Sequence, residues 1–188
     1  MAVKDFLSSG IRAVDNRLRK RLDENFAELE GRLNQLLHGG VYELQTNTAT
    51  TIALANTAYI AKGGFTAIGD NFGFTVDGTD AKFTHAHTEP TGTTHFYTIQ
   101  AFIHLSATNN DVIITRVRHW DDSAGSYTNL NTHTEQVTAT GGGNFEEKFL
   151  VNSIARLDDG DRVEIWLENS TTNTITLLKD TSIYIKGT

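Results

Sequence analysis

The first forty residues repeat apolar side chains with the spacing of an α-helix. These side chains lie three or four positions apart, and charged or amide residues fill most of the positions between them. The apolar set consists of Ile11, Val14, Leu18, Leu22, Phe26, Leu29, Leu33 and Leu36. So narrow a stripe is typical of a coiled-coil seam, because a helix packed on its own domain usually has a wider apolar face. We expect the helix to end at Gly39 and Gly40.

An isolated helix is marginally stable in water and gains most of its stability from packing. The sequence therefore predicts that residues 1–40 form a coiled-coil stalk, in which the seams of several copies pack against one another.

From residue 41 onward the apolar period changes to two, which indicates β-strands. In 95–107 the alternating set is Tyr97, Ile99, Ala101, Ile103 and Leu105, and in 161–169 it is Val163, Ile165 and Leu167. Further short strands are predicted at 112–120, 174–178 and 182–186, with turns at 108–111, 121–125, 140–144 and 157–161. Short strands with regular turn signals predict an antiparallel sandwich or barrel over 41–188, with 41–64 as connecting strands.

Charge and composition narrow the function. The formal charge of −7 is uneven, since residues 1–40 carry +1 and residues 41–188 carry −8. An acidic main domain argues against nucleic-acid binding, which depends on Lys and Arg at the phosphates. No apolar run is long enough for a membrane span, and we expect no signal peptide. The absence of cysteine from the sequence excludes disulfides, thiolate metal sites and cysteine nucleophiles.

Four stretches of the β region occur in a recognisable order: 95–120, 140–157, 157–173 and 176–188. The most specific is an L-x-x-G-D-x-V-E-x-W-x-E-N pattern formed by Leu157, Gly160, Asp161, Val163, Glu164, Trp166, Glu168 and Asn169. This succession resembles the trimeric jelly-roll domains of bacteriophage virion proteins, found in head fibres, capsid decoration and tail-fibre tips. More distantly it is similar to trimeric domains of the complement-subcomponent and tumour-necrosis-factor type. The resemblance implies a homotrimeric antiparallel jelly-roll β-sandwich with a role in the virion, and supplies no catalytic residues.

The L-x-x-G-D turn also has a physical interpretation. Gly160 can adopt a positive φ, Asp158 and Asp161 can accept hydrogen bonds from nearby backbone N–H groups, and Val163 resumes the core face. Calcium binding by the same carboxylates is the alternative.

One hairpin departs from the pattern of these domains. The usual lysine-asparagine-glycine-like turn is replaced by a longer loop at 120–134, and the candidate ligand residues there are His119, Trp120, Asp121, Asp122 and Tyr127. An aromatic ring beside acids can bind a sugar by stacking and hydrogen bonding. The alternative is a solvated turn.

Three histidines gather in 83–95, where His85 and His87 would point to the same side of a strand. Two ligands are too few for a closed metal site, but three copies around a threefold axis would supply six imidazoles for an octahedral transition metal. Some phage spike and fibre tips resemble this arrangement, with iron near the axis. The alternative is an exposed or interface strand rich in His and Thr, and no other cofactor is predicted.

The chain contains no G-x-S-x-G, H-E-x-x-H or P-loop motif, so we expect no enzyme. The leading prediction is a structural protein of a bacteriophage virion. It would be a homotrimeric surface knob, as capsid decoration or a short head fibre, made in the host cytoplasm and attached to other virion proteins through residues 1–40. The alternative is a tail-fibre or receptor-binding tip that binds host surface glycan, and a depolymerase-like enzyme is the third hypothesis.

Overall fold

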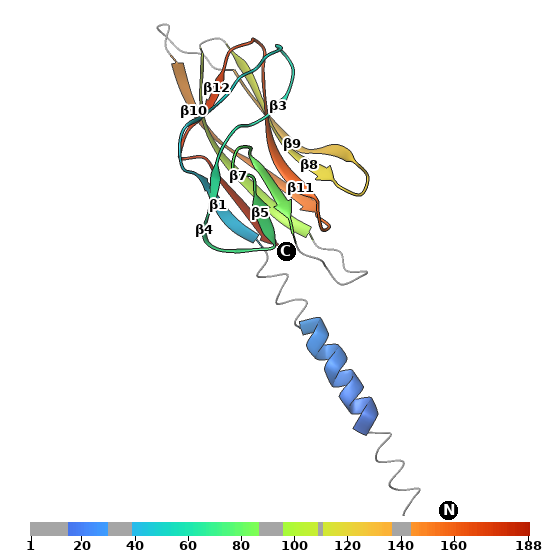
Figure 1. Ribbon diagram of the computed structural model, residues 1–188. Helices are drawn as coiled ribbons and strands as arrows, with labels where there is room; N and C mark the ends of the chain where they lie inside the picture. Colours follow the sequence, from blue (N-terminus) through green and yellow to red (C-terminus); the bar gives the residue numbers. More distant parts are fainter. Residues whose placement is uncertain (1–14, 30–38, 87–95, 109–110, 137–143) are drawn as a thin grey trace, which may run out of the picture. The chain divides into compact units, whose positions relative to one another are not determined.

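The computed structural model describes residues 15–29, 39–86, 96–108, 111–136 and 144–188. The chain divides into two compact units, Met1–Leu37 and His38–Thr188. Within the first unit, residues 15–29 form an α-helix (Figure 1). No helix in the described part of the chain combines the length and apolar character needed to cross a bilayer.

The helix leaves the predicted stripe uncovered. Leu18, Leu22, Phe26 and Leu29 are each 56–61% exposed. Ion pairs between Asp15 and Arg19 and between Lys20 and Glu24 have the i,i+4 spacing that supports a helix. The remaining members of the stripe, Ile11, Val14, Leu33 and Leu36, lie outside the described residues. The coiled coil therefore stays a prediction.

The second unit is a sandwich of two antiparallel sheets (Figure 1). Its strands are β1 (Gly39–Leu44), β2 (Thr48–Thr50), β3 (Tyr59–Ile60), β4 (Phe65–Phe72), β5 (Phe74–Val76), β6 (Lys82–His85), β7 (Phe96–Thr108), β8 (Val112–Asp121), β9 (Ser126–Gln136), β10 (Asn144–Arg156), β11 (Arg162–Asn169), β12 (Ile175–Leu177) and β13 (Ser182–Gly187). Sheet A has the order β2-β12-β7-β13-β1-β4, with β10 also paired to β7. Sheet B has the order β5-β6-β11-β8-β9, with β3 also paired to β11.

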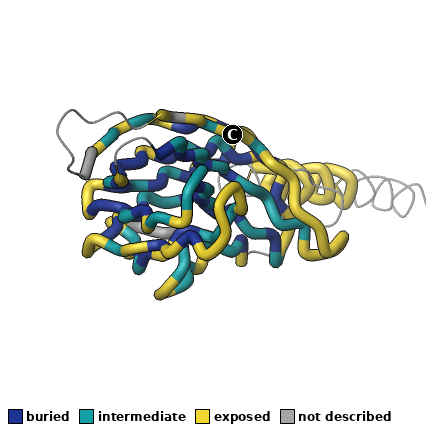
Figure 2. The backbone as a smooth tube through the Cα atoms, turned by 90° about the horizontal axis from the view of Figure 1, so that it is seen from above, coloured by how far each residue is buried: buried dark blue, intermediate teal, exposed yellow. Residues whose placement is uncertain are grey.

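The two-residue period positions the core between the sheets. All eight side chains predicted to face inward from 95–107 and 161–169 are buried, none of them more than 1% exposed. In Figure 2 the buried residues recur along the strands, with less buried residues between them. An aromatic cluster fills part of the core, where the ring of Phe83 lies 5.0 Å from that of Tyr42 and 5.4 Å from that of Phe65. Burying one side chain of this size contributes about 1.5–3 kcal/mol.

Two features differ from the sequence prediction. Gly39 and Gly40, which we expected to end the helix, instead begin strand β1 and pair with Lys186 and Ile185 of β13. The second feature is that the long loop we expected at 120–134 is wrong, because 126–136 form a strand; 144–156 form another, although neither segment has a regular apolar alternation. Strand β10 is held by thirteen consecutive register pairs with β7, and β9 pairs with β8. Pairing with a neighbouring strand outweighs the weak local signal in both.

Candidate functional site

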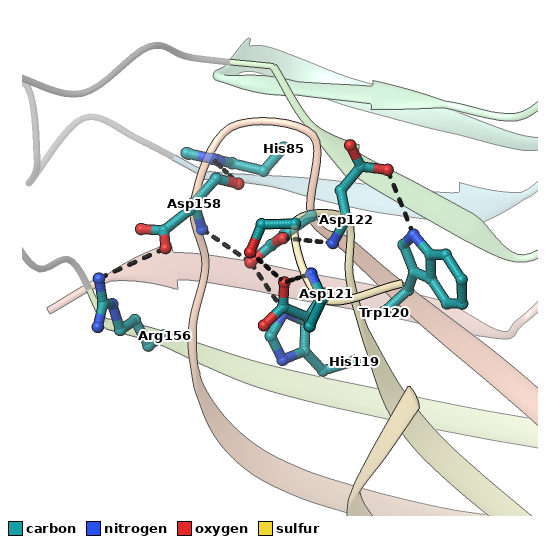
Figure 3. Close-up of polar contacts among 10 residues, drawn as sticks. His85, His119, Trp120, Asp121, Asp122, Arg156 and Asp158 are labelled. Atoms are coloured by element: carbon teal, nitrogen blue, oxygen red, sulfur yellow. Dashed lines mark hydrogen bonds and ion pairs between the residues drawn. The ribbon is translucent and has the colours of Figure 1, made fainter. Parts of the chain in front are cut away.

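The carboxylate of Asp161 joins the turn before β11 to the end of β8, and its partners are drawn in Figure 3. Its Oδ2 accepts a hydrogen bond from the backbone N–H of Asp158 at 2.9 Å and lies 2.9 Å from Nε2 of His119. Its Oδ1 accepts a hydrogen bond from the N–H of Asp122 at 3.0 Å. Asp161 is only 4% exposed, so these contacts replace water around a buried carboxylate. These contacts hold the two loops together. Because both oxygens of the carboxylate already have partners, few positions on it are left to bind a ligand.

The turn forms as the sequence predicts at Gly160 and Asp161, but not at Asp158. Gly160 has a φ of 88°, in the left-handed region that favours glycine. A Cβ at Gly160 would lie 3.2 Å from Oδ2 of Asp122, so the glycine also allows the two loops to approach. Asp161 accepts the local N–H group as expected, whereas the carboxylate of Asp158 instead pairs with Arg156 at 3.4 Å.

The acids of the predicted ligand loop mainly build the hairpin between β8 and β9. Oδ1 of Asp121 accepts hydrogen bonds from the hydroxyl of Ser123 at 2.7 Å and the N–H of Ala124 at 2.8 Å. These bonds lower the pKa of the Asp121 carboxyl. Asp122 accepts a hydrogen bond from the indole N–H of Trp120 at 3.3 Å. The solvated-turn interpretation therefore accounts for most of the contacts of these two acids.

The aromatic residues of the same loop belong to a larger array on the outer face of sheet B. We call it the aromatic–arginine ladder, and it consists of Arg162, Trp120, Tyr127, Arg118 and Trp166. The guanidinium of Arg162 lies 4.8 Å from the ring of Trp120, whose centroid is 4.7 Å from that of Tyr127. The guanidinium of Arg118 lies 4.3 Å from the ring of Tyr127 and 4.5 Å from that of Trp166. Such cation–π contacts each contribute about 0.5–2 kcal/mol.

Glu164 lies beneath this ladder and is only 1% exposed. Its Oε2 accepts a hydrogen bond from the indole N–H of Trp166 at 2.8 Å, and its Oε1 is 3.4 Å from Nε of Arg162. Burial and the neighbouring Glu164 carboxylate raise the pKa of Tyr127. The negative charge of Glu164 therefore partly balances the two arginines of the ladder. The ladder can offer a ligand the partly exposed Tyr127 ring and the edges of the guanidinium groups.

The register of sheet B explains how the ladder forms from distant parts of the sequence. Arg162 is opposite Trp120, which is itself opposite Tyr127, so one row crosses β11, β8 and β9. Even-numbered residues of β8 and β11 point outward, since their odd-numbered neighbours are in the core. The sequence pointed to Trp120 and Tyr127 only. The contributions of Arg118, Arg162 and Trp166 depend on strand pairing that the sequence pattern does not specify.

His85, the first predicted axial ligand, lies in the core and is fully buried. Its Nδ1 is 3.0 Å from the carbonyl oxygen of Asp158, and its Nε2 is 2.9 Å from the hydroxyl of Tyr97. Both ring nitrogens therefore already have partners within the chain, and this placement does not support His85 as a metal ligand. His87 lies outside the described residues. Within the described ranges, no group of three or more His, Asp or Glu side chains is placed to hold a metal ion.

A second surface, which the sequence analysis did not single out, lies on the outer face of sheet A. Six large apolar side chains there are 42–66% exposed: Ile68, Phe72, Phe96, Phe102, Leu150 and Ile154. We call this surface the sheet A face. The sequence did hold a signal for it, because Phe96 and Phe102 fall on the face of 95–107 that is opposite the alternating core set.

Solved structures with a similar fold include the following two. Eiger TNF from S. frugiperda matches with a TM-score of 0.58 and 11% identity, over 79% of this chain and 90% of that one. Murine APRIL at pH 5.0 matches with a TM-score of 0.54 and 10% identity, over 78% of this chain and 97% of that one. These likenesses confirm the predicted jelly roll and identify the fold as TNF-like. No protein-family model matches the sequence, and no curated protein matches it either.

Proposed function

We propose that this chain is a homotrimeric surface protein that associates through the sheet A face and serves as a structural knob on a bacteriophage particle. The sheet A face is the observation that carries the proposal. Monomeric soluble proteins rarely expose large contiguous apolar patches, and such patches commonly mark protein–protein interfaces. The number three and the phage particle come from the sequence resemblance to trimeric jelly-roll virion proteins, and the fold likeness agrees with a trimeric domain of the tumour-necrosis-factor type.

The strand register places the apolar side chains of this face in two groups, separated on β7 and β13 by the polar residues Gln100 and Ser182. Leu150 of β10 is directly opposite Phe102 of β7. Further along the sheet, Tyr184 of β13 is opposite Val41 of β1, which is itself opposite Ile68 of β4. A face that crosses the sheet from β10 to β4 offers each copy a broad surface for its neighbours, as a closed symmetric assembly requires.

The exposed stripe on the helix provides a second element for self-association and attachment. In this proposal the stripes of three copies pack into the coiled-coil stalk, and residues 1–40 contact other virion proteins. A structural knob has no need for catalysis or for a metal, so we also propose that the chain is not an enzyme and binds no metal ion.

Phe102→Asp tests the interface. We expect wild-type protein to have a mass near three times 20.7 kDa by light scattering, and Phe102→Asp to lower the trimer fraction strongly, since it buries a charge. Leu54→Asp is the matched control, because Leu54 is 64% exposed but does not belong to the sheet A face. A wild-type monomer, or an equal effect of the two variants, would contradict the interface.

Purified phage particles that encode this chain test the location. We expect mass spectrometry to find the protein in the particle with a copy number divisible by three. Its absence from intact particles would refute the structural role while leaving the trimer intact.

The exposed aromatic part of the ladder favours a second candidate, a receptor-binding tip that recognises host surface glycan. Tyr127 is 37% exposed at the hairpin, and Trp120 lies beside it. In that case Trp120→Ala should abolish binding of the purified protein to host cells, whereas Leu54→Asp should not. Unchanged binding by Trp120→Ala would exclude the ladder as the receptor site.

A further inference from the structure

His104 on β7 lies between two carboxylates. Its Nε2 is 3.5 Å from Oε2 of Glu146 on β10, and its Nδ1 is 3.5 Å from Oδ2 of Asp180, in the turn before β13. The same Asp180 oxygen is 3.2 Å from Nζ of Lys148. The side chain of His104 is 11% exposed, whereas those of its three charged neighbours are 52–66% exposed.

The backbone fixes the position of this histidine. The N–H of His104 donates to the hydroxyl of Thr181 at 3.1 Å, and that hydroxyl donates to the carbonyl of His104 at 2.9 Å. The N–H of Leu178 donates to the same carbonyl at 2.8 Å. These bonds fix the backbone of His104, whereas Nδ1 of its ring has no hydrogen-bond partner among the described residues.

The cluster forms part of the sheet A face. His104, Lys148 and Asp180 line a shallow depression together with Phe102 and Leu150, two of the exposed apolar residues of that face. Any copy that packs on Phe102 and Leu150 would therefore also cover the charged side chains around His104.

The charge of the cluster depends on the imidazole. Glu146, Asp180 and Lys148 together carry −1 when His104 is neutral, and protonation of His104 brings the total to zero. Lys148 lowers the pKa of the Asp180 carboxyl, so Asp180 stays ionised at mildly acidic pH. Lys179 also lowers the pKa of Asp180, but less than Lys148 and His104 do, and no ion pair joins it to the cluster within the described residues. Covering an unbalanced charge disfavours association, whereas covering a cluster whose charges balance costs less.

We propose that protonation of His104 strengthens self-association through the sheet A face, so that the assembly tightens as the pH falls through the range in which histidine titrates. Histidine ordinarily titrates near pH 6.5. The attraction between a protonated imidazole and two carboxylates is stronger away from water, so by linkage a bound proton favours the covered state. The inference rests on the proposed self-association and adds its regulation.

Analytical ultracentrifugation of the full chain at pH 5.5 and pH 8.0, at constant ionic strength, tests this inference. We expect wild-type trimers to dissociate at a concentration about tenfold lower at pH 5.5 than at pH 8.0, because protonation of His104 in each chain removes an unbalanced charge from the covered cluster. His104→Gln should abolish this difference. Equal dissociation of the wild type at both pH values, or a pH dependence that survives in His104→Gln, would overturn the inference.

Glu146→Gln supplies a test that does not alter the buried ring. With neutral His104, this variant gives the cluster a total charge of zero. Its trimer should therefore dissociate at a lower concentration than the wild-type trimer at pH 8.0. Glu147→Gln is the control, because Glu147 is the next residue of β10 and points to the opposite side of the sheet. Weaker or unchanged association of Glu146→Gln at pH 8.0 would contradict the charge argument. A wild type that is monomeric at both pH values would instead refute the proposed trimer itself.

Discussion

Asp161 shows how one carboxylate can organise two loops that are far apart in the sequence. Its partners come from the turn before β11 and from the end of β8, and none of the three contacts exceeds 3.0 Å. Donors that lose such an acceptor inside a protein each cost about 1–3 kcal/mol.

Asp161→Ala should therefore lower the free energy of unfolding by about 2–4 kcal/mol, as measured by urea denaturation. Asp158→Ala removes an exposed carboxylate from the same turn, whose ion pair with Arg156 is solvent-accessible. It should cost less than about 1 kcal/mol. Similar losses in the two variants would show that Asp161 does not hold the loops together.

At the scale of single residues, the local conformation of a turn could be predicted from the sequence. The partners that a side chain contacts in the folded protein could not. The positive φ of Gly160 and the N–H contact of Asp161 follow from the chemistry of a tight turn, and the structure confirms both. The partners of His85 could not be predicted in this way, because Tyr97 and Asp158 reach it only once β6, β7 and the turn before β11 have been brought together. A histidine two positions from another histidine has the same local pattern whether it faces a solvent-exposed axis or the core.

Among the strands, Gly39 sets the most restrictive condition on β1. It has a φ of 136°, and a Cβ at this position would overlap the carbonyl oxygen of Ile185 on the paired strand. Real Cβ atoms do not approach backbone atoms so closely, so any other residue must push β1 away from β13.

Gly39→Ala should lower the unfolding midpoint substantially, with a loss of about 2–4 kcal/mol from backbone strain and lost strand pairing. Gly78→Ala is the matched control, because a Cβ there meets no atom within 4 Å and its φ is not in the left-handed region. We expect it to change stability by less than about 1 kcal/mol. Thermal unfolding followed by circular dichroism compares the two, and a tolerant Gly39→Ala would show that β1 is free to shift.

The strands themselves were predictable in proportion to their apolar alternation. Strands β7, β8, β11, β12 and β13 lie within a residue or two of the ranges that the sequence predicts. Strand β9 has the sequence Ser-Tyr-Thr-Asn-Leu-Asn-Thr-His-Thr-Glu-Gln, in which only Tyr127 and Leu130 are apolar. Its pairing with β8 and a register shift near Val117 supply what its own sequence lacks. The aromatic–arginine ladder could not be predicted for the same reason. It depends on which residues of β8, β9 and β11 lie opposite one another as much as on which residues these strands contain.

For the whole molecule, the helix and the sheet A face make separable contributions to the proposed trimer. Leu29→Asp in the full chain should lower both the helical circular-dichroism signal and the trimer fraction, since it introduces a charge into the predicted seam. Asn25→Asp introduces the same residue at a helical position outside the apolar set, and should change both signals little. An unaltered spectrum and mass for Leu29→Asp would refute the seam.

The pairing of β13 with both β1 and β7 has a consequence for synthesis of the protein. Strand β13 lies between these two strands in sheet A, although β1 precedes it by more than a hundred residues of chain. While the ribosome extends the chain, β1 and residues 97–102 of β7 cannot yet pair with β13. That pairing becomes possible only after residues 182–187 have left the exit tunnel. Contacts so distant in sequence form slowly, and unpaired strand edges are prone to aggregate while they wait. During synthesis the edges of β1 and β7 therefore need protection from aggregation until β13 can pair with them.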